Sequence, residues 1–358
     1  MATTVKSDKI GIQKAADSIH NNGVVIFPTE TVYGIGASVY SEIGIKSIYR
    51  LKNRPSNNPL IMHVTNIQMA KSFWLLNDSE EVIIDKLSIF WPGPLTIMAK
   101  RNKNIPTYSK SDFVAIRSPD NKIAQDLIYK SGCPIVAPSA NISGKTSSTT
   151  NEHVKYYFNN EEDVIIIESD ETCNYGVEST IIKVEDNMVT IVRPGSILKT
   201  DIEEVLKDIE VATKISYLQE DSPGSDISHY QIRANTKLFN FIDESSISTQ
   251  SIFEEYTKGY LSESLLIDFG GINSCLSKYF QGYVDLSENS DPKEALFNLY
   301  NVLHQINSIR DIKNVLVFDF YSNKEGYHKV LFDRLFRCSS GKKIIIPIPE
   351  IDTIGSHE

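Results

Sequence analysis

The chain has few cysteines, no long apolar run and no excess of basic residues, and each shortage excludes a class of protein. Its 358 residues include four widely separated cysteines and no CxxC pair. We therefore expect reduced, mostly buried thiols, without a disulfide framework or a zinc site. No apolar stretch approaches the roughly 20 residues that a membrane-spanning helix needs. A formal net charge of −10 argues against a protein that coats nucleic acid, although it permits a local basic pocket.

The remaining composition is that of an ordinary globular protein. The chain is 41% hydrophobic and 23% charged, and its length is sufficient for two domains with separate cores. Residues Met1 to Gly11 are polar and contain no apolar segment typical of a signal peptide. We expect a cytoplasmic protein without a membrane segment.

Apolar periodicity predicts a strand-rich α/β domain over the first two hundred residues. The expected helices are Lys9–Asn22 with Asp8 as N-cap, one through Ile45 and Tyr49 that ends before Pro55, Glu80–Phe90, Lys122–Lys130 with Asp120 near its N-cap, and Glu203–Asp208. The expected strands are Val24–Phe27, Leu60–Val64, Leu95–Ala99, Val114–Arg117, Pro134–Ala137, Asp163–Glu168, Ser179–Val184 and Thr190–Val192.

A polar stretch, Gln219 to Ser228, interrupts this pattern and contains Pro223-Gly224, which indicates a linker. Beyond it, two buried strands, Leu265–Phe269 and Val315–Phe320, flank an amphipathic helix, Pro292–Ile306. That order predicts a smaller domain with a parallel sheet. The expected division is a catalytic domain of residues 1–212, a linker of 213–234 and a second domain of 235–350.

Several polar clusters follow apolar strands, where α/β proteins commonly bind ligands. The first contains Thr29, Glu30, Thr31 and Tyr33, and could equally be a polar turn. The second contains Lys52, Arg54 and Asn58 and is followed by a strand that ends in His63. Two cations beside amide groups suit a polyphosphate. A helix end with favourable cations and a structural histidine are the alternatives.

Three further clusters have the same construction. Arg117 ends a strand, where it could clamp a carboxylate or form a surface ion pair. Ser139 and Asn141 should point the same way from an extended segment. Gly144-Lys145-Thr146 imitates the end of a P-loop, but the first glycine of that motif is absent. Ser179 and Arg193 belong to the last cluster.

The segments PTETVYG, KNRPSNNPLIMHV, FWPGPLT, VAIRSP, APSANISG, GVEST and VRPG occur here in the order found in the YrdC-like family of L-threonylcarbamoyl-AMP synthases. The chain resembles the long members of that family, which carry a linker and a Rossmann-like C-terminal domain. Residues Gly326 to Gly341 look similar to the final helix region of that domain. The resemblance implies a twisted mixed α/β sheet with a large concave cavity, followed by a smaller α/β domain.

The resemblance also implies the reaction and its partners. The family makes threonylcarbamoyl-AMP from L-threonine, bicarbonate and ATP and releases pyrophosphate. For this chemistry we expect Mg²⁺ to bridge the phosphates of ATP. A separate transferase complex then modifies tRNAs that read ANN codons, and a weak contact with tRNA is expected. By matching positions, the threonine side is lined by Thr29, His63, Arg117, Ala137 and Ser179. ATP is held by Lys52, Arg54, Asn58, Ser139, Asn141, Arg193 and the linker residue Tyr230, with Lys52, Arg54, Ser139 and Asn141 closest to the chemistry.

The chain departs from the family pattern at two places. Phe113 stands where threonine is usual, four residues before Arg117, and the linker lacks the proline that usually follows Tyr230. Two other functions stay open: a non-catalytic module that binds RNA or nucleotides, and a carbamoyltransferase that uses carbamoyl phosphate. The net charge disfavours the first, and the second usually carries zinc-finger regions that this chain lacks.

Overall fold

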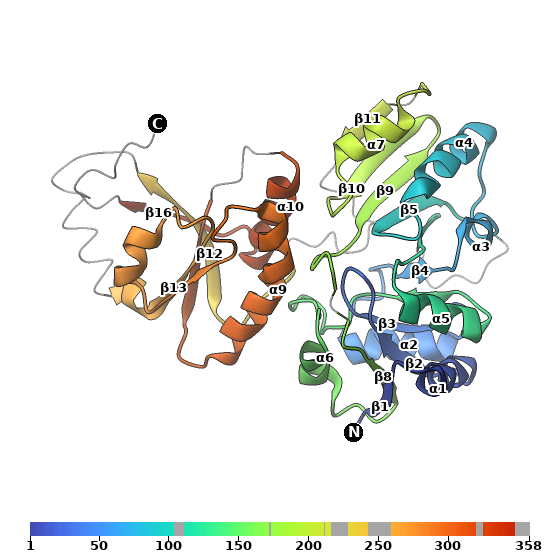
Figure 1. The fold of residues 1–358 in the computed structure, drawn as a ribbon, viewed down its shortest axis with the longest axis horizontal. Helices are drawn as coiled ribbons and strands as arrows, with labels where there is room; N and C mark the ends of the chain where they lie inside the picture. Colours follow the sequence, from blue (N-terminus) through green and yellow to red (C-terminus); the bar gives the residue numbers. More distant parts are fainter. Residues whose placement is uncertain are drawn as a thin grey trace. The chain divides into compact units, whose positions relative to one another are not determined.

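The computed structural model describes residues 1–103, 111–171, 173–210, 212–215, 228–242, 259–319 and 325–347 (Figure 1). The chain divides into two compact units, Met1–Asp226 and Ile227–Glu358, and each is described by itself. Pro223 and Gly224 of the predicted linker lie outside the described residues. In the described part, no helix is long and apolar enough to cross a membrane.

The first unit contains a mixed sheet whose described strands run in the order β1-β8-β2-β3-β7-β4-β6-β5-β9-β10-β11. These strands are β1 (Thr3–Lys6), β2 (Val24–Phe27), β3 (Gly34–Ser38), β4 (Ile61–His63), β5 (Leu95–Lys100), β6 (Phe113–Arg117), β7 (Ile135–Ala137), β8 (Val164–Glu168), β9 (Thr180–Glu185), β10 (Met188–Arg193) and β11 (Ala212–Ile215). Parallel and antiparallel neighbours both occur, so the predicted mixed sheet is confirmed.

Helices pack on the two faces of this sheet. They are α1 (Lys9–His20), α2 (Glu42–Lys52), α3 (Ile67–Lys71), α4 (Asp78–Leu87), α5 (Lys122–Ser131), α6 (Asn151–Phe158) and α7 (Lys199–Leu206), with a 3₁₀ turn, η1 (Ser88–Phe90). Asp8 caps α1 as predicted, because its carboxylate accepts hydrogen bonds from two backbone amides. The N-cap of α5 is Asn121 rather than Asp120, since the Asn121 side chain accepts from Ile123 and Ala124.

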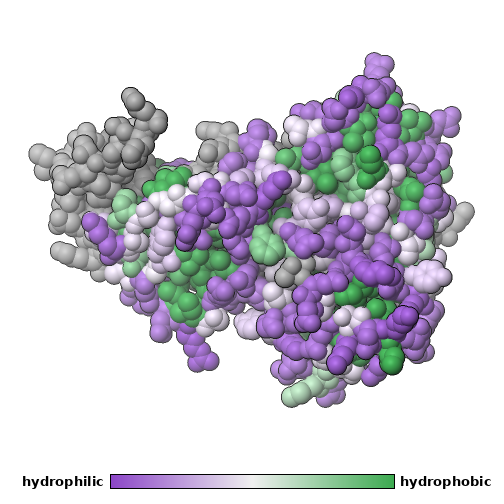
Figure 2. Space-filling model, viewed as in Figure 1, coloured by the Kyte–Doolittle hydropathy of each residue, from purple (hydrophilic) through white to green (hydrophobic). Residues whose placement is uncertain are grey.

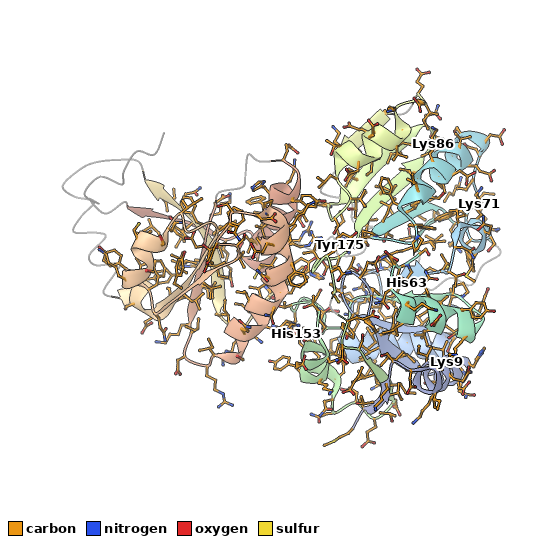
Figure 3. The ribbon with its side chains drawn as sticks, in the orientation of Figure 1. Lys9, His63, Lys71, Lys86, His153 and Tyr175 are labelled. Atoms are coloured by element: carbon orange, nitrogen blue, oxygen red, sulfur yellow. The ribbon has the colours of Figure 1, made fainter. Side chains whose placement is uncertain are left out.

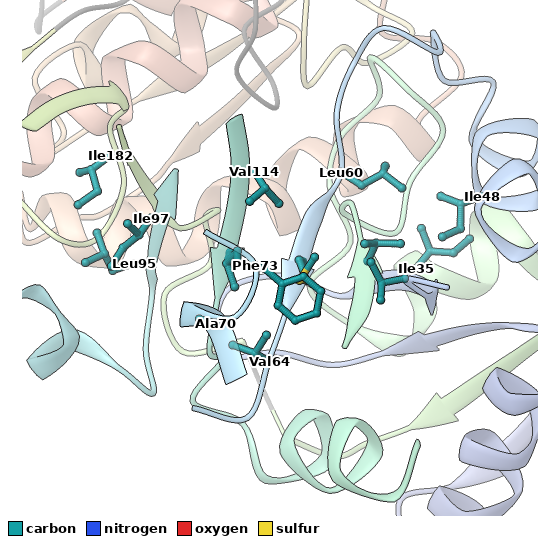
Figure 4. Close-up of a cluster of buried hydrophobic side chains, with 14 of the residues drawn as sticks. Ile35, Ile48, Leu60, Val64, Ala70, Phe73, Leu95, Ile97, Val114 and Ile182 are labelled. Carbon is teal, nitrogen blue, oxygen red and sulfur yellow. The ribbon is translucent and has the colours of Figure 1, made fainter. Parts of the chain in front are cut away.

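Alternation along each strand assigns side chains to the two faces. In β2, Val25 and Phe27 pack under α1 and α5, whereas Val24 and Ile26 enter the larger core on the other face. Figure 4 shows part of that larger core, where side chains from several strands meet those of α2 and α3. The space-filling view shows mainly hydrophilic atoms on the visible face of this unit, with small hydrophobic patches between them (Figure 2).

Some element predictions were incomplete. The polar N-terminus forms β1, which pairs with β8, and α7 begins at Lys199 rather than Glu203. Strand β3 was not predicted because its sequence, GIGAS, has low strand propensity. Its Gly36 is required by packing, since an added Cβ would lie 2.5 Å from Ile135 Cγ2.

The second unit has a five-stranded sheet in which every described pairing is parallel, in the order β14-β13-β15-β12-β16. Its elements are β12 (Asn235–Ile242), η2 (Leu261–Glu263), β13 (Ser264–Asp268), η3 (Ser274–Tyr279), β14 (Gly282–Asp285), α9 (Pro292–Ser308), β15 (Asn314–Phe318), α10 (Tyr327–Cys338) and β16 (Lys343–Pro347). The predicted small parallel-sheet domain is confirmed. Its helix α9 carries seven buried residues, consistent with its amphipathic sequence.

Candidate active site

The polar clusters found in the sequence are tied together by backbone hydrogen bonds in the first unit. Tyr33 N donates to Ser148 O at 2.9 Å, and Ala140 N donates to Tyr33 O at 2.7 Å. Ser143 N donates to Lys52 O at 2.8 Å. These bonds connect the loop after β2, the end of α2 and the segment after β7, so residues distant in sequence share one region.

The strand residues of this region lie on one face of the sheet. Ile61, Met98, Ala115, Ile181 and Val192 form a small apolar cluster there. Two residues along each strand, on the same face, stand the polar side chains His63, Thr96, Arg117 and Ser179. This part of the face carries polar groups, whereas the part over β2 and β7 packs under α1 and α5.

Arg117 is the best-defined candidate. Its side chain is buried and pairs with Glu30, with 2.6 Å between Nη2 and Oε1. Nη1 donates to Thr31 Oγ1 at 2.9 Å, and Nε donates to Gly93 O at 3.3 Å. A guanidinium has five N–H groups. Nη2 is in ion-pair contact with Glu30 but makes no hydrogen bond, so each Nη keeps at least one N–H without a hydrogen-bond partner among the described residues. Arg117 therefore keeps two donors suited to a carboxylate while remaining fixed by its neighbours.

Arg117 and Glu30 come from opposite ends of the middle strands. In the antiparallel pairing of β4 and β7, His63 lies opposite Ile135, and Arg117 lies level with His63 in the parallel neighbour β6. Glu30 lies in the loop after β2. The last residue of β2, Phe27, is level with Gly34 and Ser139, at the end of the sheet opposite to Arg117. Since β4 and β7 have only three residues each, loops from one end of the sheet can reach side chains at the other.

His63 is buried at the end of β4, in the interior of the first unit (Figure 3). Burial, followed by the positive charge of Arg117, lowers the pKa of His63 to about 3. The ring is therefore neutral at physiological pH. Its Nδ1 lies 3.1 Å from Ile61 O, and the ring packs edge-on against Phe27 with centroids 6.0 Å apart.

Thr29 is also buried, but its hydroxyl serves the turn that follows β2. It donates to Val32 O at 2.6 Å and accepts from the amides of Thr31 and Val32 at 3.2 Å. Thr29 therefore shapes the loop that presents Glu30 and Thr31 to Arg117. Ala137 is buried opposite Ile61 and adds an apolar wall to this face.

Ser179 and Arg193 form a second buried group. Arg193 Nη2 donates to Ser179 O at 2.8 Å and to Ser179 Oγ at 3.1 Å, and Ser179 Oγ lies 2.7 Å from Thr96 Oγ1. A register shift between Ile191 and Arg193 permits this contact, because a bulge re-aims the following side chain. Thr96 was not among the predicted site residues, although a threonine inside an apolar strand was an available signal.

Lys52 lies in the last turn of α2, where a lysine is usually solvated, but its side chain is buried. Its Nζ donates to Ser139 O at 2.6 Å and to Asn141 O at 2.5 Å. Burial and the adjacent Arg54 hold the pKa of Lys52 well below its usual range. Lys52 therefore braces the segment that carries Ser139 and Asn141.

The Ser139 and Asn141 side chains do meet, as the extended segment predicted. Ser139 Oγ donates to Asn141 Oδ1 at 2.6 Å. The Asn141 amide then donates to Ile142 O and Lys145 O, both at 2.8 Å. These bonds fix the turn rigidly beside the buried end of Lys52.

Arg54 lies in the turn after α2 and holds the segment that leads to β4. It donates from Nε to Asn58 O at 3.0 Å and from Nη2 to Asn58 Oδ1 at 2.5 Å and Pro59 O at 2.7 Å. Phe113, where the family has threonine, begins β6 and lies under Lys183, whose Nζ is 3.9 Å from the ring centroid.

Tyr230, the remaining candidate, is packed inside the second unit. Its ring is 1% exposed and stacks on Tyr300 with centroids 5.2 Å apart, and the Arg334 guanidinium lies 5.6 Å from its centroid. Its φ is +63°.

A glycine loop after β13 in the second unit presents backbone amides of the kind that can bind an anion. Gly270 N donates to Asp285 Oδ1 at 3.0 Å, and Gly271 N donates to Asp285 Oδ2 at 2.6 Å. An internal carboxylate already occupies these amides. Among the described residues of the whole chain, no group of three or more His, Cys, Asp and Glu side chains could hold a metal ion.

Of the four cysteines, Cys173 and Cys338 are buried, Cys133 is half-buried and Cys275 is exposed, and all four are free. The prediction of free thiols is confirmed, but only two are fully buried. Burial, followed by the charge of Glu30, raises the pKa of Cys173 well above its usual range, so this thiol stays protonated.

Comparison with known proteins identifies relatives of both units. A family model described as "Telomere recombination" matches residues 17–195, and one described as "Threonylcarbamoyl-AMP synthase, C-terminal domain" matches residues 197–340. The threonylcarbamoyl-AMP synthase of Bacillus subtilis is 38% identical over 253 residues, covering 69% of this chain and 71% of its own. That of Schizosaccharomyces pombe is 33% identical over 368 residues, covering 92% and 88%. The crystal structure of Pyrococcus abyssi Sua5 complexed with L-threonine is similar in fold, with a TM-score of 0.79 and 27% identity, and covers 97% of this chain and 99% of its own.

Proposed function

This chain belongs to the threonylcarbamoyl-AMP synthase family, and from that premise we propose how its own residues carry out the reaction. The enzyme joins L-threonine, bicarbonate and ATP into threonylcarbamoyl-AMP and releases pyrophosphate. Its product serves the threonylcarbamoyladenosine modification of tRNAs that read ANN codons. The relatives bear the name of an enzyme, which favours this function over a non-catalytic module.

The observation that carries the proposal is the buried Arg117 with two unused N–H groups. A fixed guanidinium of this kind binds a carboxylate bidentately. We assign the α-carboxylate of L-threonine to it. Thr29, His63, Ala137 and Ser179 line the same side, and His63 does so as a neutral ring because of its lowered pKa.

We place ATP along the predicted nucleotide-binding residues rather than along those that line the L-threonine side. Arg54, Asn58 and Arg193 supply charge and donors toward the nucleotide, and Ser139 and Asn141 form the turn beside it. Lys52 acts mainly by bracing that turn, since two of its donors already bind backbone carbonyls. Tyr230 is the linker residue that we expect to contact the nucleotide.

The chemistry needs positioning and charge neutralisation more than a protein nucleophile. The threonine amine condenses with bicarbonate to a carbamate and water. The carbamate oxygen then attacks the α-phosphorus as pyrophosphate departs. Mg²⁺ usually binds substrate phosphates through few protein ligands, and it enters here as the ion that ATP carries. A cytoplasmic location, a downstream transferase complex and a weak tRNA contact complete the proposal.

Labelled bicarbonate tests this function directly. The full chain is incubated with ATP, Mg²⁺, L-threonine and labelled bicarbonate, and the products are separated. We expect labelled threonylcarbamoyl-AMP and an equal amount of pyrophosphate, both dependent on L-threonine. Pyrophosphate release that is independent of L-threonine, or no product from folded protein, would contradict the proposal.

A further inference from the structure

Glu30 is a buried carboxylate to which the reaction so far gives no role. It is 3% exposed and contacts Arg117 at 2.6 Å. Its backbone carbonyl accepts a hydrogen bond from Tyr175 N at 3.0 Å. Glu30 is therefore positioned by a backbone hydrogen bond and by its ion pair with Arg117.

Among the residues that the structure describes, none donates a hydrogen bond to the Glu30 carboxylate. Apart from its ion pair with Arg117, neither Oε1 nor Oε2 accepts a hydrogen bond from any described residue. The other buried glutamates of the first unit differ. Glu178 accepts from Ser147 Oγ at 2.6 Å, and Glu80 accepts from the amides of Asn77 and Asp186, both at 3.0 Å. Because buried carboxylates normally find several donors, the missing donor of Glu30 points to a ligand.

The charges around Glu30 match an amino acid. A free α-amino acid carries an ammonium and a carboxylate on the same carbon. Arg117 and Glu30 present a cation and an anion side by side, and Arg117 keeps two donors while it pairs with Glu30. This pair is complementary to such a zwitterion.

We propose that Glu30 determines specificity for the α-amino group: it accepts a hydrogen bond from the ammonium of L-threonine while Arg117 holds the carboxylate. This inference rests on the proposed function and names the group of the substrate that Glu30 binds. A carboxylic acid that lacks the amine would lose this contact and keep the one to Arg117.

The competing explanation is that Glu30 only positions Arg117. The two explanations differ in which ligands a substitution affects. A positioning role weakens every carboxylate ligand by the same factor, whereas an ammonium contact weakens L-threonine selectively. The analogue 3-hydroxybutanoate, in which a hydrogen replaces the amine, distinguishes them.

Calorimetric titration of the full chain with L-threonine and with 3-hydroxybutanoate, without ATP, is the test. In Glu30→Gln, which removes the charge and keeps the shape, we expect the affinity for L-threonine to fall about tenfold or more, the usual effect of losing a hydrogen bond to a charged group. The affinity for the analogue should change much less. Thr31→Val is the matched control, because it removes another contact of Arg117 and should weaken both ligands alike.

Equal losses for both ligands in Glu30→Gln, or no loss for either, would overturn the proposal. If this variant does not fold, the wild-type protein decides: it should bind L-threonine at least about tenfold more tightly than the analogue, and equal affinities would refute the ammonium contact. Failure of the proposed function is a separate result, since the wild type would then form no threonine-dependent pyrophosphate.

Discussion

The neutral, buried ring of His63 makes the stability of the first unit depend on pH in a way that one substitution should remove. The pKa of His63 is lowered to about 3 in the folded protein, against about 6.5 in an unfolded chain. Because the folded pKa is the lower one, the stabilisation is fully present above pH 6.5 and is lost as pH falls toward 3.

The magnitude follows from these two values. Between pH 7.5 and pH 5.0, proton binding to the unfolded chain should lower the free energy of unfolding by about 2 kcal/mol. Both pH values lie above the folded pKa, so the unfolded pKa sets nearly the whole effect. His63→Gln cannot titrate, and its amide can still donate to Ile61 O. The free energy of unfolding of this variant should therefore fall by about 2 kcal/mol less than that of the wild type over this pH range.

Urea unfolding followed by tryptophan fluorescence is the assay. The chain has two tryptophans, Trp74 and Trp91, and both lie in the first unit with stacked rings 6.2 Å apart. Fluorescence therefore reports the unit that contains His63. Stability curves against pH that run parallel in wild type and His63→Gln would refute a neutral buried ring.

Four other substitutions test the remaining assignments. Lys52→Met should lower the free energy of unfolding of the first unit by about 2 kcal/mol in the same urea assay, because two backbone carbonyls lose their donor; unchanged stability would contradict the bracing role. Arg54→Lys keeps the charge but loses the fork that holds Asn58 and Pro59, so KM for ATP should rise about tenfold while KM for L-threonine stays close to wild type. Arg117→Lys should raise KM for L-threonine about tenfold and leave KM for ATP unchanged, and equal changes in both would exclude the carboxylate role. Tyr230→Ala should destabilise the second unit by about 3 kcal/mol, measured by calorimetry as a shift of the transition that tryptophan fluorescence does not follow.

Local patterns predicted most of the elements that position the site. Strand β2, helix α5 and strand β6 were found because their apolar residues recur with the period of a strand or a helix. Strands β1 and β3 were not found. The first is a short polar segment that becomes a strand by pairing with β8, and the second is rich in glycine for packing reasons.

The candidate residues were recognisable from sequence, but several of their partners were not. Arg117, Ser139 and Asn141 stood at strand ends in motifs that resembled a known family. The pairing of Arg117 with Glu30 joins two residues 87 positions apart that the sheet order brings together. No periodicity encodes such a contact, because it arises from how neighbouring strands pair.

Lys52 shows which properties of a residue followed from the sequence and which depended on the tertiary structure. Its place in the last turn of a helix followed from the sequence, and there a lysine is usually solvated. The fold instead places the segment after β7 over this helix end, so that the ammonium binds the carbonyls of Ser139 and Asn141. The sequence by itself determined the family, the mixed α/β character and which side chains carry chemistry, because these follow from local composition and motif order. Burial, ion pairing and the lowered pKa values of His63 and Lys52 were decided only by the tertiary structure, because desolvation and Coulomb energies depend on distances between residues that are remote along the chain.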